Sequence, residues 1–169
     1  MDQGWFWERS ADGAARFVLG TVGQRPLVCF GVNPSTAIPG APDRTVSRVQ
    51  GFAFDNGYDS WIMLNVYPQI ATDPNDMHAE QDVELSAENE RHIMAVLRVQ
   101  PPTLLAAWGG LITKRPYLRA ALRDILKIAD SAGGSWLSIG KREAGQHPLH
   151  PLYQRAVTPL EPYDPAMYS

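Results

Sequence analysis

Residues 26–36 read PLVCFGVNPST. The first seven letters form an apolar run of strand length, and the last four form a polar turn. In sheets of alternating strands and helices, ligands bind beyond the carboxyl ends of the strands. The turn is therefore either a plain cap or one wall of a binding site, and these residues alone leave both interpretations open.

Apolar runs of the same kind recur at residues 60–66, 103–108 and 135–139, and residues 16–20 form a candidate extra edge strand. Helical periodicity fills the gaps: a helix over 43–56 closed by Gly57, a second opened by Ser86 and ended by Pro101-Pro102, and a third starting near Pro116. This alternation predicts an α/β fold, a three-layer α/β/α sandwich around a short, mainly parallel, four-stranded central sheet.

Composition is that of an ordinary globular chain, with 169 residues, 44% hydrophobic and 20% charged. We expect a single α/β domain over 1–169, ending in a proline-rich tail over 156–169. The chain has no apolar run of membrane-spanning length and no signal-peptide pattern near its start, which predicts a cytoplasmic protein. Its one cysteine, Cys29, lies in an apolar run and is expected to be a buried, inert thiol.

Charge is unevenly distributed over a chain whose net charge is −3. From residue 108 to 155 there are eight basic residues against three acidic ones, whereas acidic residues crowd positions 73–90. This asymmetry permits one face that binds an anionic ligand, and solvated helix faces explain it equally well. A nucleotide or nucleic acid is an admissible partner, and no membrane partner is expected.

Polar residues near the predicted strand ends are the candidate site. Asn33 offers a carboxamide donor and acceptor, and Asp43, a helix N-cap in the simplest interpretation, is also placed to act as a base toward water. Around them the candidate substrate-binding residues are Pro34, Ser35, Thr36, Arg48, Asn65, Tyr67, Trp108, Gly109 and Tyr153. Each has a structural alternative: a turn, a buried hydrogen bond or a core aromatic side chain.

The loop at residues 140–155 contains His147 and His150, each followed by proline. Two histidines without neighbouring cysteine or carboxylate ligands are weak evidence for zinc, so no metal and no cofactor are expected. His150 is instead a candidate donor to an oxygen that carries or gains negative charge.

The segments GVNPSTA, DRT with Arg48, GY, LNVYP, ATDP, AAWG and HPLYQ occur in an order that resembles a bacterial domain-of-unknown-function family numbered 1643. The layout is also similar, more loosely, to the uracil-DNA glycosylase superfamily. That second resemblance implies that Asn33 lies after the first core strand, that Asn65 reads a base edge and that His150 stands near a base oxygen. The His-Pro-Ser-Pro motif of that superfamily is replaced here by His-Pro-Leu-Tyr.

These observations support three hypotheses. The first is a domain that recognises a nucleobase or nucleotide, as a glycosidase-type hydrolase with Asn33, Asp43 and His150 as catalytic residues. The second is a non-catalytic domain that binds a nucleotide or another small molecule. The third is a structural domain that binds a partner through its proline-rich tail.

Overall fold

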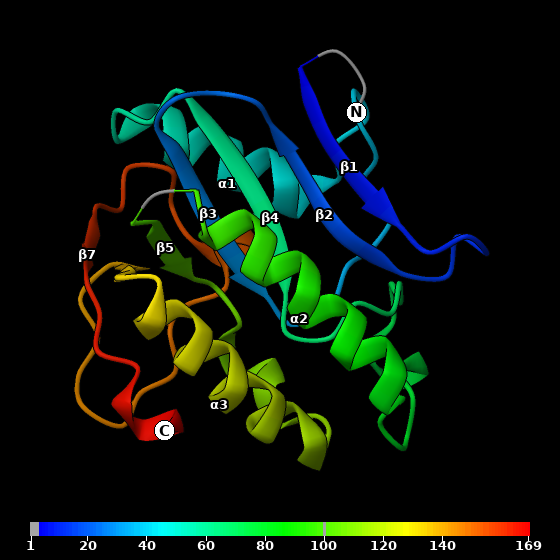
Figure 1. The fold of residues 1–169 in the computed structure, drawn as a ribbon. Coiled ribbons are helices and arrows are strands. Elements are labelled where there is room, and N and C mark those ends of the chain that lie inside the picture. The colour runs from blue at the N-terminus through cyan, green and yellow to red at the C-terminus, as the bar shows by residue number, and fades with distance from the viewer. Residues whose placement is uncertain (1–3, 100) are drawn as a thin grey trace.

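A seven-stranded mixed sheet organises the computed structural model, which describes residues 4–99 and 101–169 (Figure 1). The order of the strands is β1-β2-β4-β3-β5-β6-β7. Their bounds are β1 Trp5–Arg9, β2 Arg16–Thr21, β3 Pro26–Gly31, β4 Ser60–Asn65, β5 Thr103–Ala106, β6 Ser135–Ile139 and β7 Leu160–Pro162. The prediction of a mainly parallel, four-stranded sheet is thus wrong, because the sheet has seven strands and three of its six strand pairs are antiparallel. The α/β class is confirmed.

The four predicted strands are β3, β4, β5 and β6, which lie side by side in the middle of the sheet and run parallel to one another. Antiparallel strands extend the sheet on both sides, with β2 and β1 beyond β4 and β7 beyond β6. Residues 16–20 were expected at an edge, but β2 pairs on both sides and β1 is the edge strand. The Trp5, Phe6 and Trp7 side chains of β1 pack alternately on the two cores.

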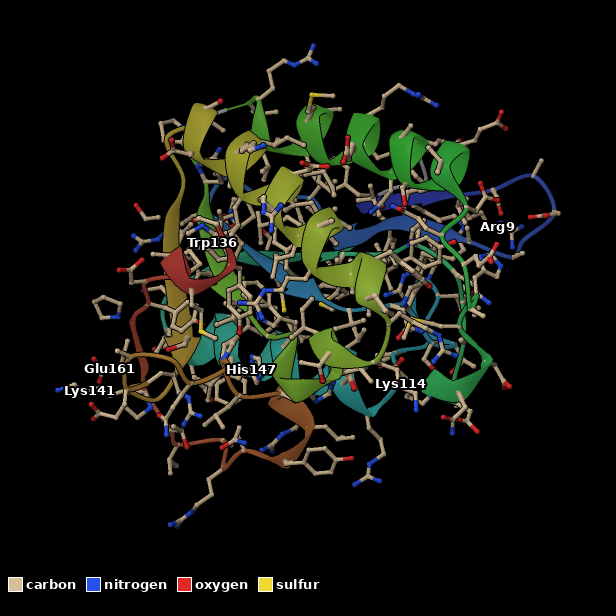
Figure 2. All side chains as sticks on the ribbon, turned by 90° about the horizontal axis from the view of Figure 1, so that it is seen from below. Arg9, Lys114, Trp136, Lys141, His147 and Glu161 are labelled. Carbon is tan, nitrogen blue, oxygen red and sulfur yellow. The ribbon has the colours of Figure 1, made fainter. Side chains whose placement is uncertain are left out.

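Three helices cover the sheet, α1 (Arg44–Asp55) on one face and α2 (Val83–Leu97) with α3 (Pro116–Ser131) on the other. Figure 2 views these layers from below, with α2 and α3 on one side of the sheet and α1 on the opposite side. Alternate strand residues face the two sides, so Val28 and Phe30 meet one core while Leu27 and Cys29 meet the other. The short 3-10 helices are η1 Pro74–Asp76, η2 Gly109–Thr113, η3 Pro151–Tyr153 and η4 Ala166–Tyr168.

Capping residues set the helix boundaries. Asp43 caps α1 through a 2.8 Å bond from the Val46 N–H, and Gly57 follows that helix with a φ of 85°. The prediction that Ser86 opens α2 is wrong, because Asp82 accepts the Leu85 N–H and the helix starts four residues earlier than Ser86 implied. Pro116 opens α3 as expected.

The proline-rich segment after residue 156 packs on the fold. Leu160–Pro162 forms β7 along β6, and Tyr163 donates its N–H to Trp136. Tyr168, next to the last residue, is fully buried against Trp108. The prolines in this segment therefore accompany an edge strand and a docked turn, positions in which a missing N–H costs little.

Candidate functional site

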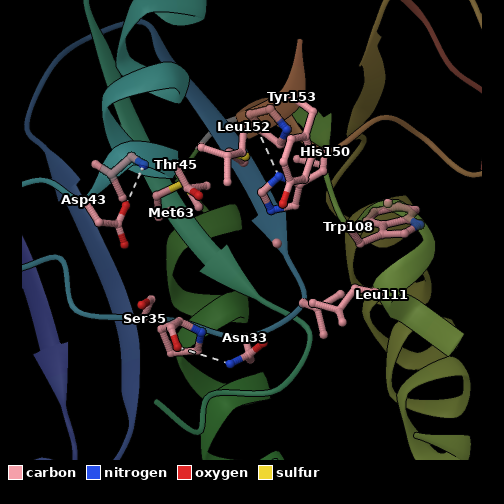
Figure 3. Close-up of a pocket in the computed structure, with 18 of the residues that line it drawn as sticks. Asn33, Ser35, Asp43, Thr45, Met63, Trp108, Leu111, His150, Leu152 and Tyr153 are labelled. Atoms are coloured by element: carbon pink, nitrogen blue, oxygen red, sulfur yellow. Dashed lines mark hydrogen bonds between the residues drawn. The ribbon is translucent and has the colours of Figure 1, made fainter. Parts of the chain in front are cut away.

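A cavity of about 810 Å³ opens at the carboxyl ends of the parallel strands. Its walls come from the segments at 31–36, 43–46, 71–74, 107–111 and 147–154, together with Arg16 and Arg142. Figure 3 shows the cavity with Asn33 and Ser35 at its lower side, Asp43 at the left and His150 at the upper right. Of the predicted site residues, it brings together Asn33, Pro34, Ser35, Thr36, Asp43, Trp108, Gly109, His150 and Tyr153.

Asn33 directs its carboxamide nitrogen into the protein. Its Nδ2 donates to the Ala71 carbonyl at 2.9 Å and to the Pro34 carbonyl at 3.2 Å. Ser35 extends this link, because its hydroxyl lies 3.0 Å from that of Thr72. The amide nitrogen is thus used to tie the end of β3 to the loop after β4. The Asn33 Oδ1 makes no hydrogen bond within the described residues, so the amide oxygen is the unpaired end of this side chain.

Asp43 stands at the N-terminus of α1, opposite the His150 loop (Figure 3). Its Oδ1 accepts the Val46 N–H, so one oxygen performs the predicted capping role. Its second oxygen has no hydrogen-bond partner among the described residues. The carboxylate is close enough for its charge to favour the protonated form of His150.

His150 projects its ring into the cavity (Figure 3). The Leu152 N–H donates to its Nδ1 at 3.1 Å, so Nδ1 is an acceptor and the neutral ring carries its proton on Nε2. Burial lowers the pKa of His150 from its ordinary value, and the charge of Asp43 opposes this effect. Nε2 has no partner among the described residues, which makes it a free donor inside the cavity.

Gly109 makes room for this histidine. A Cβ on Gly109 would stand 3.3 Å from the His150 Cβ, and its φ of 56° is in the left-handed region. The glycine was predicted to permit close approach of a ligand, whereas the group that approaches it is the His150 backbone and Cβ.

The two aromatic candidates differ in exposure. Trp108 is fully buried and packs edge-on against Trp136, Tyr163 and Tyr168, so it supports the cavity wall from within the core. Tyr153 is 80% exposed beside His150, with ring centroids 5.9 Å apart. Of the two, Tyr153 has the free face that stacking on a flat ligand requires.

Three predicted residues do not line this cavity. Asn65 is 1% exposed and lies behind Gly31, with its Oδ1 3.2 Å from the position of a Cβ on that glycine. Tyr67 is buried, where its hydroxyl contacts His78 and accepts the Asp82 N–H. Arg48 donates to the Pro151 carbonyl at 3.5 Å and so supports the loop that carries His150.

Arg16 lines the cavity but was not predicted from the sequence. It begins β2, and its N–H donates to Pro68, which brings it next to the end of the antiparallel strand β4. The sequence feature that could have indicated Arg16 as a site residue is a charged residue at the start of an apolar strand. Arg142 was also missed; its Nε donates to the His147 carbonyl at 2.9 Å.

The described residues contain neither a metal-binding cluster nor a membrane-spanning helix. No group of three or more histidine, cysteine or acidic side chains there is arranged to hold a metal ion. No helix of residues 4–99 and 101–169 has the length and apolar character needed to cross a bilayer. Cys29 is buried on the cavity side, and burial raises the pKa of its thiol.

A comparison with protein families identifies one match, a family described as a protein of unknown function (DUF1643), over residues 16–152. The chain belongs to this family. The match covers every cavity segment described above except residues 153 and 154 at the end of the His150 loop. No curated protein and no solved structure matches the chain, so the looser resemblance to the uracil-DNA glycosylase superfamily is not confirmed.

Proposed function

We propose that the cavity recognises a nucleobase or nucleotide and that the protein hydrolyses an N-glycosidic bond there. The observation that carries the proposal is the state of His150: a neutral, fixed imidazole whose Nε2–H is the free donor in the cavity. Such a donor stabilises an oxygen that gains negative charge as a base departs from its sugar. Its lowered pKa keeps the ring neutral at neutral pH, which retains the acceptor role of Nδ1.

The other groups have complementary roles in this proposal. Asn33 Oδ1 accepts a hydrogen bond from a water molecule or from the ligand, since its Nδ2 is engaged with Ala71. The free oxygen of Asp43 takes the proton of the attacking water as the bond to the sugar forms. Tyr153 provides an exposed ring for stacking on the base at the mouth of the cavity. The loose resemblance to uracil-DNA glycosylases favours the same assignment as an analogy only.

One observation favours the alternative of a non-catalytic binding domain. The two side chains proposed to contact the attacking water each already make a structural hydrogen bond through one of their atoms. Asn33 Nδ2 donates to the Ala71 carbonyl, and Asp43 Oδ1 accepts the Val46 N–H in the first turn of α1. A site built only for recognition needs no further group to activate water.

A substrate panel tests the proposal. The full chain is incubated with nucleosides, nucleotides and oligonucleotides that contain uracil, hypoxanthine or modified bases, and base release is measured by chromatography. Base release by the wild type that is lost in His150→Asn supports hydrolysis. Arg123→Gln is the control, because Arg123 is exposed on α3. Binding without release across the panel favours the non-catalytic alternative. The absence of both binding and release would overturn the proposal.

A further inference from the structure

Arg16 is a cation held inside the protein with few partners. Its side chain lines the cavity and belongs to a residue only 2% exposed. Its Nη1 donates to the Ala37 carbonyl at 3.1 Å, but its Nε has no hydrogen-bond partner within the described residues. A guanidinium has five N–H donors, and a buried charged group is costly unless it is paired. Most N–H donors of this side chain are therefore unused among the described residues.

Asp43 compensates this charge only from a distance. No ion pair within 4.0 Å joins Arg16 to a carboxylate in the described part of the chain, although the charge of Asp43 does favour the cationic form. Burial lowers the pKa of Arg16 to about 10, so the group is still cationic at neutral pH. One oxygen of Asp43 is committed to the Val46 N–H, which reduces what it can offer to Arg16.

The whole cavity is cationic although the chain carries a net charge of −3. Its described lining has three arginines, Arg16, Arg44 and Arg142, against the single carboxylate of Asp43. The N-terminus of α1, a helix of 12 residues, faces the same space. The N–H groups of Arg44 and Thr45 in its first turn have no acceptor among the described residues, and such groups favour an anion.

We propose that Arg16 and the first turn of α1 form an oxyanion subsite that holds the phosphate monoester of a mononucleotide. This inference rests on the proposed function, whose cavity it shares and whose substrate class it narrows. A phosphate suits the arrangement because its tetrahedral oxygens can meet a guanidinium fork and helix N–H groups from different directions. A polymer fits poorly, because an internal phosphodiester would have to carry a nucleotide on each side into a cavity where Arg16 is only 2% exposed.

Calorimetry on the full chain tests this subsite with inorganic phosphate, the common nucleoside 5′-monophosphates and the matching nucleosides. The wild type should bind a monophosphate about 10- to 100-fold more tightly than its nucleoside, the range expected for charge-assisted hydrogen bonds. Arg16→Gln should remove that difference, and Arg16→Lys should restore part of it. Arg123→Gln is the matched control, since Arg123 is exposed on α3. If Arg16→Gln does not fold, the affinities of the wild type for a monophosphate and for its nucleoside still test whether the cavity holds a phosphate.

The outcomes separate this inference from the proposed function. A nucleoside that binds as tightly as its monophosphate overturns the subsite and leaves nucleobase recognition standing. In another outcome, inorganic phosphate binds in an Arg16-dependent manner but no nucleotide binds more tightly than phosphate. This result supports the oxyanion subsite. It refutes both the mononucleotide as the occupant of the subsite and the proposed function. Unchanged phosphate binding in folded Arg16→Gln, or no binding of any probe to the wild type, overturns the inference.

Discussion

Two His-Pro pairs lie three residues apart in the same loop, and the fold uses them differently. His147 directs its Nδ1 at the hydroxyl of Tyr168, 2.5 Å away, with the two rings nearly parallel. His150 accepts the N–H of Leu152 within its own turn and leaves Nε2 free in the cavity. The same dipeptide thus anchors the C-terminal segment in one case and leaves a donor facing the cavity in the other. A histidine motif alone does not decide between structure and chemistry; the partner of each nitrogen does.

The largest effect should follow replacement of the His150 donor. In His150→Asn, the side-chain oxygen can still accept the Leu152 N–H, while the Nε2 donor is lost. We expect the rate of base release to fall by about 100-fold or more, as for the loss of one oxyanion donor, with little change in the thermal midpoint. Single-turnover rates and thermal unfolding check this. A variant that is destabilised and fully active would place His150 in the same class as His147.

Replacement of His147 should show the opposite profile. His147→Ala leaves the hydroxyl of the buried Tyr168 without its partner, which should lower the free energy of unfolding by about 1–3 kcal/mol. Binding and turnover at a temperature where the variant is folded should hardly change. Denaturant unfolding of His147→Ala, Tyr168→Phe and the double variant measures the coupling. Additive losses would show that the pair contributes no interaction energy, and lost turnover in a folded variant would contradict the contrast with His150.

Gly109 and Gly110 offer a smaller and more local test. Gly109→Ala adds a Cβ 3.3 Å from the His150 Cβ at a φ of 56°, so it should cost about 1 kcal/mol and displace His150. Gly110→Ala is the matched control, because its Cβ would meet nothing within 4 Å. We expect nucleotide affinity and turnover to fall only in Gly109→Ala. Equal effects at both glycines would show that the loss comes from η2 and has no connection with His150.

The central part of the sheet and the edge where the cavity lies could be predicted from local sequence patterns. The apolar runs and their turn residues indicated β3, β4, β5 and β6, and the parallel arrangement then brought Asn33 to the same edge as the His150 loop. Local patterns were sufficient there because strand period and turn chemistry act over a few residues.

The rest depended on contacts between distant residues. Tyr168 decides the role of His147 from 21 positions away, and the Asn33 amide is taken up by Ala71, 38 positions along the chain. Arg16 is a cavity residue because β2 returns antiparallel to β4, an orientation that no motif in β2 specifies. Asn65 occupies the expected strand end, but its side chain lies behind Gly31.

The smallest expected effect is on the pH dependence of stability. Burial lowers the pKa of His150 in the folded protein, whereas the unfolded chain titrates near the ordinary 6.5. The unfolded state therefore binds the proton more readily, so the contribution of the neutral ring is complete above about pH 6.5 and decreases as the pH falls toward the folded pKa. Wild type should lose stability more steeply than His150→Asn between about pH 7 and pH 5, by at most about 1.4 kcal/mol per pH unit for one proton. Urea unfolding of both proteins measures the difference, since all other histidines are common to them. Parallel curves, or a steeper loss in the variant, would mean that His150 does not have to be neutral in the fold, which would remove the physical basis for its contrast with His147.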